Sequence, residues 1–311
     1  MGALVLAGWG DNGKSKRSEA RPGPVQRHAL QDGIFVESLP ALSQLTLGRV
    51  SPAADGAGAD AWPEFRVVIL TRSTRHAALI LEALRLSGLQ CHGVLIERSA
   101  TGALLRRTRD MWRRRGWRPT VQAMFRQLWS RLNGDAEKWE AICRQWVRAG
   151  GVIPSADLTG EDSVERLREL RPDVTVLAGT PLLPASVLEV ARLGTLNVHP
   201  GLLPRYRGVD VVAHAILNGD PVGATVHFVD AGIDTGRIIS RIRVSPGPLD
   251  TLASLQKRVD RAGAEELAHV VSRLVHGERI EGEVQSSRFP LCRWLSPDAR
   301  RRAEARLRGG G

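Results

Sequence analysis

The chain has 311 residues, enough for one large domain or two small ones, and its 42% hydrophobic and 25% charged content is that of an ordinary globular protein. No apolar run reaches the roughly 18 residues that a membrane-spanning helix needs, and the start lacks the basic residue of a secretion signal. Three widely spaced cysteines favour neither a disulfide framework nor a zinc knuckle, so we expect a cytoplasmic protein.

The net charge of +11 suggests a nucleic-acid partner at first sight. Only four of the 44 basic residues are lysines, however, and the other 40 are arginines. A GC-rich coding background produces such a skew as readily as selection for phosphate binding does. The charge alone therefore does not predict a nucleic-acid partner, and we expect none.

Residues 1–60 are rich in Gly, Ala, Pro and Ser and show no persistent apolar period, which predicts a disordered leader. Residues 8–15 match the phosphate-loop pattern G-x-x-x-x-G-K-S. That motif needs a helix to begin at its lysine, and Pro22, Gly23 and Pro24 follow almost at once. We therefore interpret the match as a chance one and expect no nucleotide site here.

The folded part is expected to begin at Arg66. Residues 66–70 form a run that is apolar on both faces, as a buried parallel strand requires, and 76–88 read as a helix closed by a glycine. Residues 90–97 then predict a second strand, so the domain opens with a strand–helix–strand unit. The turn 71–76 lacks the G-x-G-x-x-G of a dinucleotide site, which argues against a nicotinamide or flavin cofactor.

Residues 101–150 interrupt this alternation with 12 basic residues against four acidic ones, and they hold five of the eight tryptophans. These are Trp112, Trp117, Trp129, Trp139 and Trp146. One interpretation is a helical hairpin that packs its tryptophans on the domain and turns its arginines to water. The other is a lid or a docking surface for an anionic substrate.

The α/β pattern resumes after this insertion and predicts four more strands and four more helices. The expected strands are 173–179, 195–199, 224–229 and 236–244, and the expected helices 163–170, 184–194, 211–219 and 251–276. We expect a catalytic domain over 61–280 that contains the insertion, and a basic tail over 281–311.

Two segments place an amide, an imidazole and two carboxylates where strands are predicted to end. Asn197 and His199 are two residues apart at one strand end and so point to the same face, and Pro200 helps to end that strand. Asp230 and Asp234 lie in the loop after another strand. Because ligands of parallel sheets bind at the carboxyl ends of the strands, these side chains could converge on one site.

Such a trio suits the transfer of an acyl-level carbon to an amine. Asn197 can donate a hydrogen bond to the oxyanion that develops on the carbonyl oxygen. His199 can assist that charge or move a proton, and Asp234 can fix the imidazole tautomer or hold a water that relays the proton.

The same residues also fit structural roles. The Asn-x-His pair could be hydrogen-bonded scaffold, the two carboxylates could cap turns, and His227 in mid-strand could be an ordinary half-buried histidine. No two histidines have metal-ligand spacing on one element, so we expect no metal site.

The order of these motifs resembles the signature region of the folate-dependent formyltransferases. The residues concerned are NVHPGLLPRYRG at 197–208 and GATVHFVDAGIDTG at 223–236. The similarity extends from about Arg66 to His276 outside the insertion and is densest over 176–238. It implies a Rossmann-like α/β formyltransferase fold, with a mostly parallel sheet, flanking helices and a helical insertion. It also implies 10-formyltetrahydrofolate as co-substrate.

The resemblance assigns roles to individual residues. The family's catalytic asparagine, histidine and aspartate fall on Asn197, His199 and Asp234. Its folate-binding strand end and loop fall on Leu177, Ala178, Gly179, Thr180, Val229, Asp230, Ala231, Gly232 and Ile233. Acceptor contacts are expected from Arg72, Arg75, Pro200, Gly201 and Arg207. His227 is expected to support the active loop.

Departures from the family's pattern narrow the expected acceptor. Purine-pathway members hold a substrate phosphate with a Gly- and Ser-rich first turn, whereas the first turn of this chain is TRSTRH. Members that act on tRNA carry a further β-barrel domain. Hydrolytic relatives carry an N-terminal regulatory domain, for which 1–60 lacks the apolar pattern. Gly201 stands where most relatives have serine. We therefore expect a small-molecule amine acceptor, such as an amino sugar. The alternatives are a phosphoribosylglycinamide or methionyl-tRNA formyltransferase, a formyltetrahydrofolate hydrolase and a non-catalytic folate- or partner-binding relative.

Overall fold

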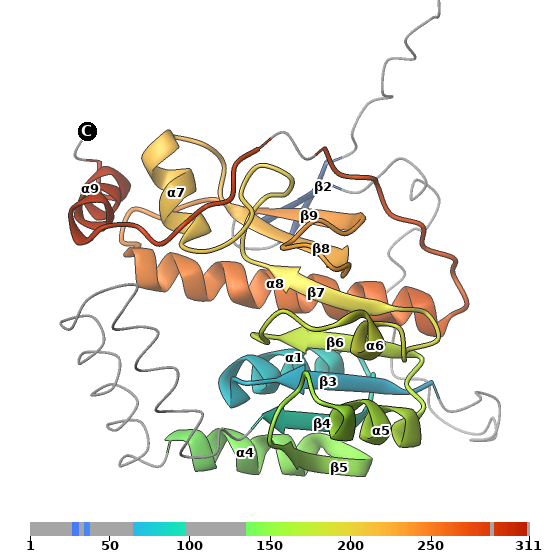
Figure 1. Cartoon of the computed structure of the whole chain (residues 1–311). Coiled ribbons are helices and arrows are strands. Elements are labelled where there is room, and N and C mark those ends of the chain that lie inside the picture. The colour runs from blue at the N-terminus through green and yellow to red at the C-terminus, as the bar shows by residue number, and fades with distance from the viewer. Residues whose placement is uncertain (1–26, 31–33, 38–64, 98–134, 287–288, 310–311) are drawn as a thin grey trace, which may run out of the picture.

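The computed structural model describes residues 27–30, 34–37, 65–97, 135–286 and 289–309. Its centre is a nine-stranded sheet with helices packed on both faces (Figure 1). The strand order is β1-β2-β9-β8-β7-β6-β3-β4-β5. The α/β class expected from the sequence is confirmed, and over the seven strands β3 to β9 the sheet is mostly parallel.

One half of the sheet consists of neighbouring parallel strands. They are β3 (Val67–Thr71), β4 (Cys91–Glu97), β5 (Val147–Ser155), β6 (Val174–Ala178) and β7 (Thr195–His199). The central strand β3 is buried along its whole length because helices cover both faces of the sheet. Along β3, Val67 and Ile69 pack into one core, whereas Val68 and Leu70 pack into the other.

The other half is antiparallel and continues from β7. It consists of β8 (Gly223–Phe228), β9 (Ile238–Val244), β2 (Ile34–Glu37) and β1 (Arg27–Leu30). β8 pairs with β7 so that Asn197 lies opposite His227, and this cross-strand pair becomes important for the site. β1 and β2 fall within the expected leader and extend the sheet beyond β9, which the sequence analysis did not predict. The rest of that leader lies outside the described residues.

Two helical layers cover the sheet. α1 (Thr74–Leu86), α4 (Asp135–Trp146) and α8 (Leu252–Val275) belong to the larger core, and α5 (Glu161–Leu170) and α6 (Ala185–Leu188) cover the opposite face. α7 (Val211–Asn218) packs against α9 (Pro297–Leu307) beside the antiparallel half. None of the helices in the described ranges is both long and apolar enough to cross a membrane.

Helix α8 approaches strand β7 closely because it carries a glycine in its middle. A Cβ atom added at Gly263 would lie 2.5 Å from Cγ1 of Val198 on β7 and 3.0 Å from Cβ of Ala224 on β8. Glycine in a helix interior costs about 1 kcal/mol relative to alanine, so its presence here is explained by the close packing that it permits.

Three predicted boundaries are wrong. α6 has four residues instead of the predicted 184–194, because the N–H groups of Arg192 and Leu193 bond back to Pro172 and Asp173 and draw the chain out of the helix. β5 begins at Val147, inside the expected insertion, because residues 147–155 pair with β4.

The third wrong boundary concerns the expected basic tail, which contains helix α9. This helix buries Ala299 and Ala303. The described part of the insertion, 135–150, comprises α4 and the start of β5. Trp146 of α4 packs against the core, with Arg85 stacked over its ring at 5.2 Å. Residues 98–134, with Trp112, Trp117 and Trp129, lie outside the described residues.

Candidate active site

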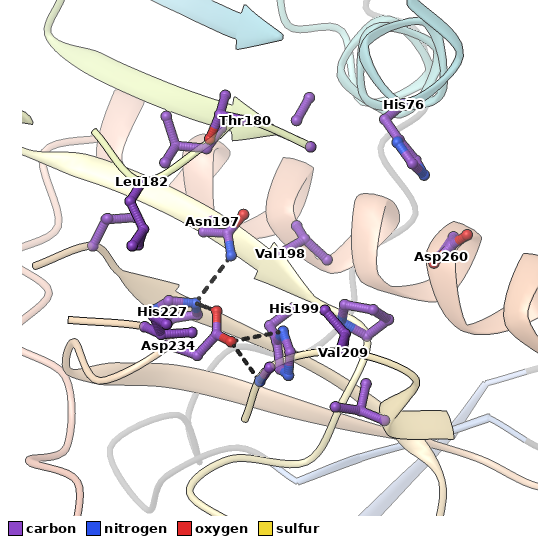
Figure 2. A pocket seen from close by; sticks show the side chains of 18 of the residues that line it. His76, Thr180, Leu182, Asn197, Val198, His199, Val209, His227, Asp234 and Asp260 are labelled. Atoms are coloured by element: carbon purple, nitrogen blue, oxygen red, sulfur yellow. Dashed lines mark hydrogen bonds and ion pairs between the residues drawn. The ribbon is translucent and has the colours of Figure 1, made fainter. Parts of the chain in front are cut away.

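A cavity of about 800 Å³ opens at the carboxyl ends of β6 and β7, where ligands of parallel sheets bind. Its walls come from β6, β7, β8, the loop after β8, and helices α1 and α8. Figure 2 shows Asn197, His199, His227 and Asp234 gathered at one place in this cavity, with Thr180 and Leu182 to one side. His76 and Asp260 lie on the other side.

His227 fixes the orientation of the Asn197 amide. Nδ1 of His227 lies 2.6 Å from the carbonyl oxygen of Phe228, which can only accept, so Nδ1 carries the proton. Nε2 is then an acceptor, and it receives a hydrogen bond of 3.2 Å from Nδ2 of Asn197. The amide therefore presents its nitrogen to this cluster, and its second N–H remains for a ligand.

The electrostatics of His227 agree with this tautomer. Burial lowers the pKa of His227 below its ordinary value, and the nearby His199 adds to that effect. The hydrogen bond to the Phe228 carbonyl is the largest opposing effect, and the carboxylates of Asp234 and Asp230 oppose the shift more weakly. The imidazole is therefore held neutral, as acceptance of the Asn197 hydrogen bond requires.

His199 is buried and held at both ring nitrogens. Nε2 lies 2.5 Å from the carbonyl oxygen of Tyr206, so this nitrogen carries a proton. Nδ1 faces Oδ2 of Asp234 at 3.5 Å. Gly201 makes the first contact possible, since a Cβ there would lie 2.6 Å from the Tyr206 oxygen and 2.8 Å from Nε2 of His199. Nδ1 is thus the atom that can gain or lose a proton beside a carboxylate.

Asp234 occupies a left-handed backbone conformation with a φ of 52°, which is uncommon for a residue with a side chain. Its Oδ2 accepts a hydrogen bond of 2.9 Å from the N–H of Gly208, and its Oδ1 lies 3.9 Å from Nε2 of His227. The loop conformation and the Gly208 N–H together aim the carboxylate at His199. The structure therefore brings the three expected catalytic side chains together.

Most residues expected to bind the folate line this cavity. Those that do are Leu177, Ala178, Gly179, Thr180, Val229, Asp230, Gly232 and Ile233, whereas Ala231 does not. Asp230 also caps its own loop, because its Oδ1 accepts hydrogen bonds from Gly232 N–H and from the Thr235 hydroxyl. The turn-capping interpretation is therefore confirmed for Asp230, whereas the catalytic role of Asp234 stays a prediction.

The residues expected to contact the acceptor divide differently. Pro200 lines the cavity, whereas Arg72, Arg75, Gly201 and Arg207 are not among its lining residues. Nε of Arg72 lies 3.5 Å from Glu97, Arg75 is exposed, and Nε of Arg207 donates to the carbonyl of Ile233.

The sequence analysis missed a second polar group in the cavity. Asp260 and Gln256 come from α8, four residues apart on one helix face, and Oδ1 of Asp260 accepts a hydrogen bond of 2.7 Å from Gln256. Burial raises the pKa of the Asp260 carboxyl, although Gln256 and the nearby His76 and Arg75 oppose the shift. The sequence feature that could have predicted this group is the polar pair itself, which stands beside buried Leu255 and Val259. We expected this helix only to cover the sheet.

Comparison with known proteins places this geometry in a family. A family described as Formyl transferase matches residues 66–271. The methionyl-tRNA formyltransferase of Syntrophomonas wolfei is 35% identical over 136 residues, which are 43% of this chain and 43% of that protein. That of Methylococcus capsulatus is 39% identical over 136 residues, 43% and 44% of the two chains. The aligned part is therefore less than half of these relatives.

A solved structure shares the fold. It is the glycinamide ribonucleotide transformylase 1 of Symbiobacterium toebii, with a TM-score of 0.51 and 22% identity over 71% of this chain and 93% of that one. Since the family match covers more than half of the 311 residues and includes the Asn197, His199 and Asp234 cluster, the chain belongs to the formyl transferase family.

Proposed function

We propose that the protein is a folate-dependent formyltransferase that carries a formyl group from 10-formyltetrahydrofolate to an amine of a small molecule. The observation that carries this proposal is the meeting of Asn197, His199 and Asp234 at one point of a large cavity. An amide donor, an imidazole and a carboxylate are the groups that transfer of an acyl-level carbon to an amine requires.

The residues on one side of the cavity fit a folate. Gly179 ends β6 with a φ of 67°, which leaves backbone groups accessible there, and Leu182 and Ile233 offer exposed apolar surface to a flat ring. Bound 10-formyltetrahydrofolate would supply the formyl carbon at the catalytic cluster. Leu177–Thr180 and Val229–Ile233 are the segments that would hold it.

Each catalytic side chain has a distinct task in this proposal. The second N–H of the Asn197 amide donates to the oxygen on which negative charge builds. Nδ1 of His199 takes up the proton that the attacking amine loses, and the carboxylate of Asp234 stabilises the imidazolium that results. The imidazolium then gives this proton to the nitrogen from which the formyl group departs, which restores neutral His199. His227 acts on none of the reacting atoms; it holds Asn197.

The other side of the cavity supports a polar acceptor. The second carboxylate oxygen of Asp260 has no hydrogen bond from any described residue, so it is available to a hydroxyl or ammonium group. His76 faces the same space (Figure 2). An amino sugar would offer hydroxyl groups to this pair while its amine reaches His199.

Methionyl-tRNA is a second candidate acceptor, because methionyl-tRNA formyltransferases match this chain at 35% and 39% identity. The shared part is less than half of those proteins, so the match by itself does not transfer their acceptor to this chain.

One experiment separates these possibilities. The protein is incubated with 10-formyltetrahydrofolate and, in parallel, with amino sugars, methionyl-tRNA, glycinamide ribonucleotide or no acceptor, and each product is analysed by mass spectrometry. We expect one formyl group on an amino sugar. Formylation of methionyl-tRNA alone would replace the small-molecule proposal, formate release without acceptor would indicate a hydrolase, and binding without any turnover would indicate a non-catalytic relative.

A further inference from the structure

We propose that the chain beyond the family match completes the active site, with Gln285 as a positioning residue for Asp234. This inference rests on the proposed function, since it concerns how that same catalytic aspartate is held. The family match ends at residue 271, and the segment concerned is residues 282–286 and 289–295, here named the C-terminal strap.

Gln285 contacts the loop that carries Asp234. Its Nε2 donates hydrogen bonds to the carbonyl oxygens of Asp234, at 3.1 Å, and of Gly236, at 2.5 Å. Both partners can only accept, so the orientation of the amide is determined. Its Oε1 is buried and has no hydrogen-bond partner among the described residues, which is unfavourable. The placement of this side chain is therefore not explained by its oxygen. The N–H groups that bind the loop explain it better.

The strap anchors Gln285 on the sheet. Glu283 and Ile238 exchange two backbone hydrogen bonds of 2.7 and 2.8 Å at the start of β9. Oε2 of Glu283 also accepts from Nη1 of Arg241 at 2.9 Å. Gln285 therefore reaches the Asp234 loop from a fixed base and not from a free end.

The same strap also sets the position of the N–H that binds the Asp234 carboxylate. Cys292 donates to the carbonyl of Arg207 at 2.8 Å and accepts from the N–H of Val209 at 3.2 Å, on either side of Gly208. A Cβ at Gly208 would lie 2.4 Å from the Cys292 oxygen, so only glycine permits this approach. The N–H of Gly208 then donates to Oδ2 of Asp234.

Asp234 is thus held twice by the strap, at its backbone by Gln285 and at its carboxylate through Gly208. Asp234 has a left-handed φ of 52°, which is strained for a residue with a side chain. We therefore expect the loop to relax if the Gln285 hydrogen bonds are lost. A shift of about 1 Å in a catalytic group can reduce turnover about 10²-fold. We therefore expect Gln285 to influence the reaction through Asp234 without touching a substrate.

The test compares Gln285→Met, which keeps the length of the side chain but has no N–H group, with Val284→Thr, a change at an exposed neighbouring position. We expect Gln285→Met to lower kcat about 10- to 100-fold, with KM for both substrates within about 2-fold. The thermal midpoint should change no more than in Val284→Thr. A fall in stability with unchanged kcat would overturn the proposal.

A double-mutant cycle shows whether the effect passes through Asp234. In an Asp234→Asn background, measured as single turnovers, the Gln285→Met change should cost less than about 3-fold, because the charge that it positions is gone. Equal fold losses in both backgrounds would contradict a positioning role.

Backbone hydrogen exchange over residues 229–236 tests the proposal independently of activity. Exchange should be faster in Gln285→Met than in the wild type and Val284→Thr, and equal rates would overturn the inference. If the wild-type protein formylates no amine, the proposed function fails, while this exchange measurement still decides whether Gln285 orders the loop.

Discussion

The two ends of the cavity are built differently. At the catalytic end, Asn197, His199 and Asp234 each have a fixed hydrogen-bond partner, which is His227, Tyr206 and Gly208 respectively. At the opposite end, Asp260 has a single hydrogen-bond partner among the described residues, and one of its oxygens is left for a ligand. The comparison shows that the fold fixes the side chains of the catalytic cluster. In the proposed function, acceptor recognition is left to a few side chains of α8 and α1.

The largest effect is expected at Asp234. The change Asp234→Asn keeps an oxygen that can accept from Gly208 but removes the charge that stabilises a protonated His199. We expect kcat to fall by about 10³-fold, within the range of lost acid–base catalysis, with unchanged folding. Steady-state kinetics measure the loss, and Asp298→Asn on the exposed surface of α9 is the matched control. Retention of more than a tenth of wild-type turnover would contradict the role of this carboxylate.

A loss of about 10²–10³-fold in kcat is expected for Asn197→Ala, because the reaction then lacks one oxyanion donor. The thermal midpoint serves as the folding control, since the change also frees Nε2 of His227. If kcat stays within about 5-fold of the wild type, Asn197 has only a structural role as hydrogen-bonded scaffold. The two ends of the cavity would then be alike in that Asn197, like Asp260, takes no part in the chemistry.

Asp260→Asn sharpens the comparison from the other end. The amide keeps the shape of the side chain but loses the charge that would bind a hydroxyl or ammonium group. We expect KM for the acceptor to rise about 10-fold, with kcat and the KM for 10-formyltetrahydrofolate nearly unchanged. Initial rates with each substrate varied in turn measure this. A fall in kcat with constant acceptor KM would place Asp260 in the chemistry instead.

The smallest effect concerns the pH dependence of stability. Because burial lowers the pKa of His227 below 6.5, the unfolded chain binds a proton here as the pH falls through 6.5, whereas the folded protein does not. The free energy of unfolding therefore decreases as the pH falls from 7 to 5, by about 1.4 kcal/mol for each unit of pKa depression at most.

His227→Gln should remove this contribution, so its stability should depend less on pH than that of the wild type. Urea unfolding at pH 5, 6 and 7 measures the difference. Glu266, whose pKa is raised by burial, contributes the opposite slope in both proteins and cancels from the comparison. Parallel slopes for the two proteins would mean that His227 is not held neutral.

The sequence predicted the catalytic end much better than the other end. Asn197 and His199 are two residues apart on one strand, so the period of a strand alone places them together, and Asp234 lies in the loop after β8, the strand that pairs with β7. Asp260 comes from a helix whose primary role is packing, Gln285 lies in the irregular segment between α8 and α9, and His76 lies 121 residues before Asn197 in the chain. Such contacts arise from how layers pack, which no local pattern encodes.

Helix α9 is another element that the sequence analysis did not predict. Ser296 accepts from the N–H of Ala299 and Pro297 follows it, which together form a recognisable helix start. The arginine-rich composition nevertheless favoured the prediction of a basic tail, because α9 buries only Ala299 and Ala303 and so lacks a strong apolar period. A start signal was present, and the weak amphipathic pattern concealed it.

Gly263 determines how closely α8 lies against β7 at the cavity. It lies one helical turn after Asp260 and lets α8 rest directly on Val198, the residue between Asn197 and His199. The span between α8, which carries Asp260, and β7, which carries Asn197 and His199, is therefore set by an absent side chain. Any larger residue at this position would move α8 outward and widen that span. In the proposed function, the size of the acceptor is thus adjustable at a position that does not line the cavity.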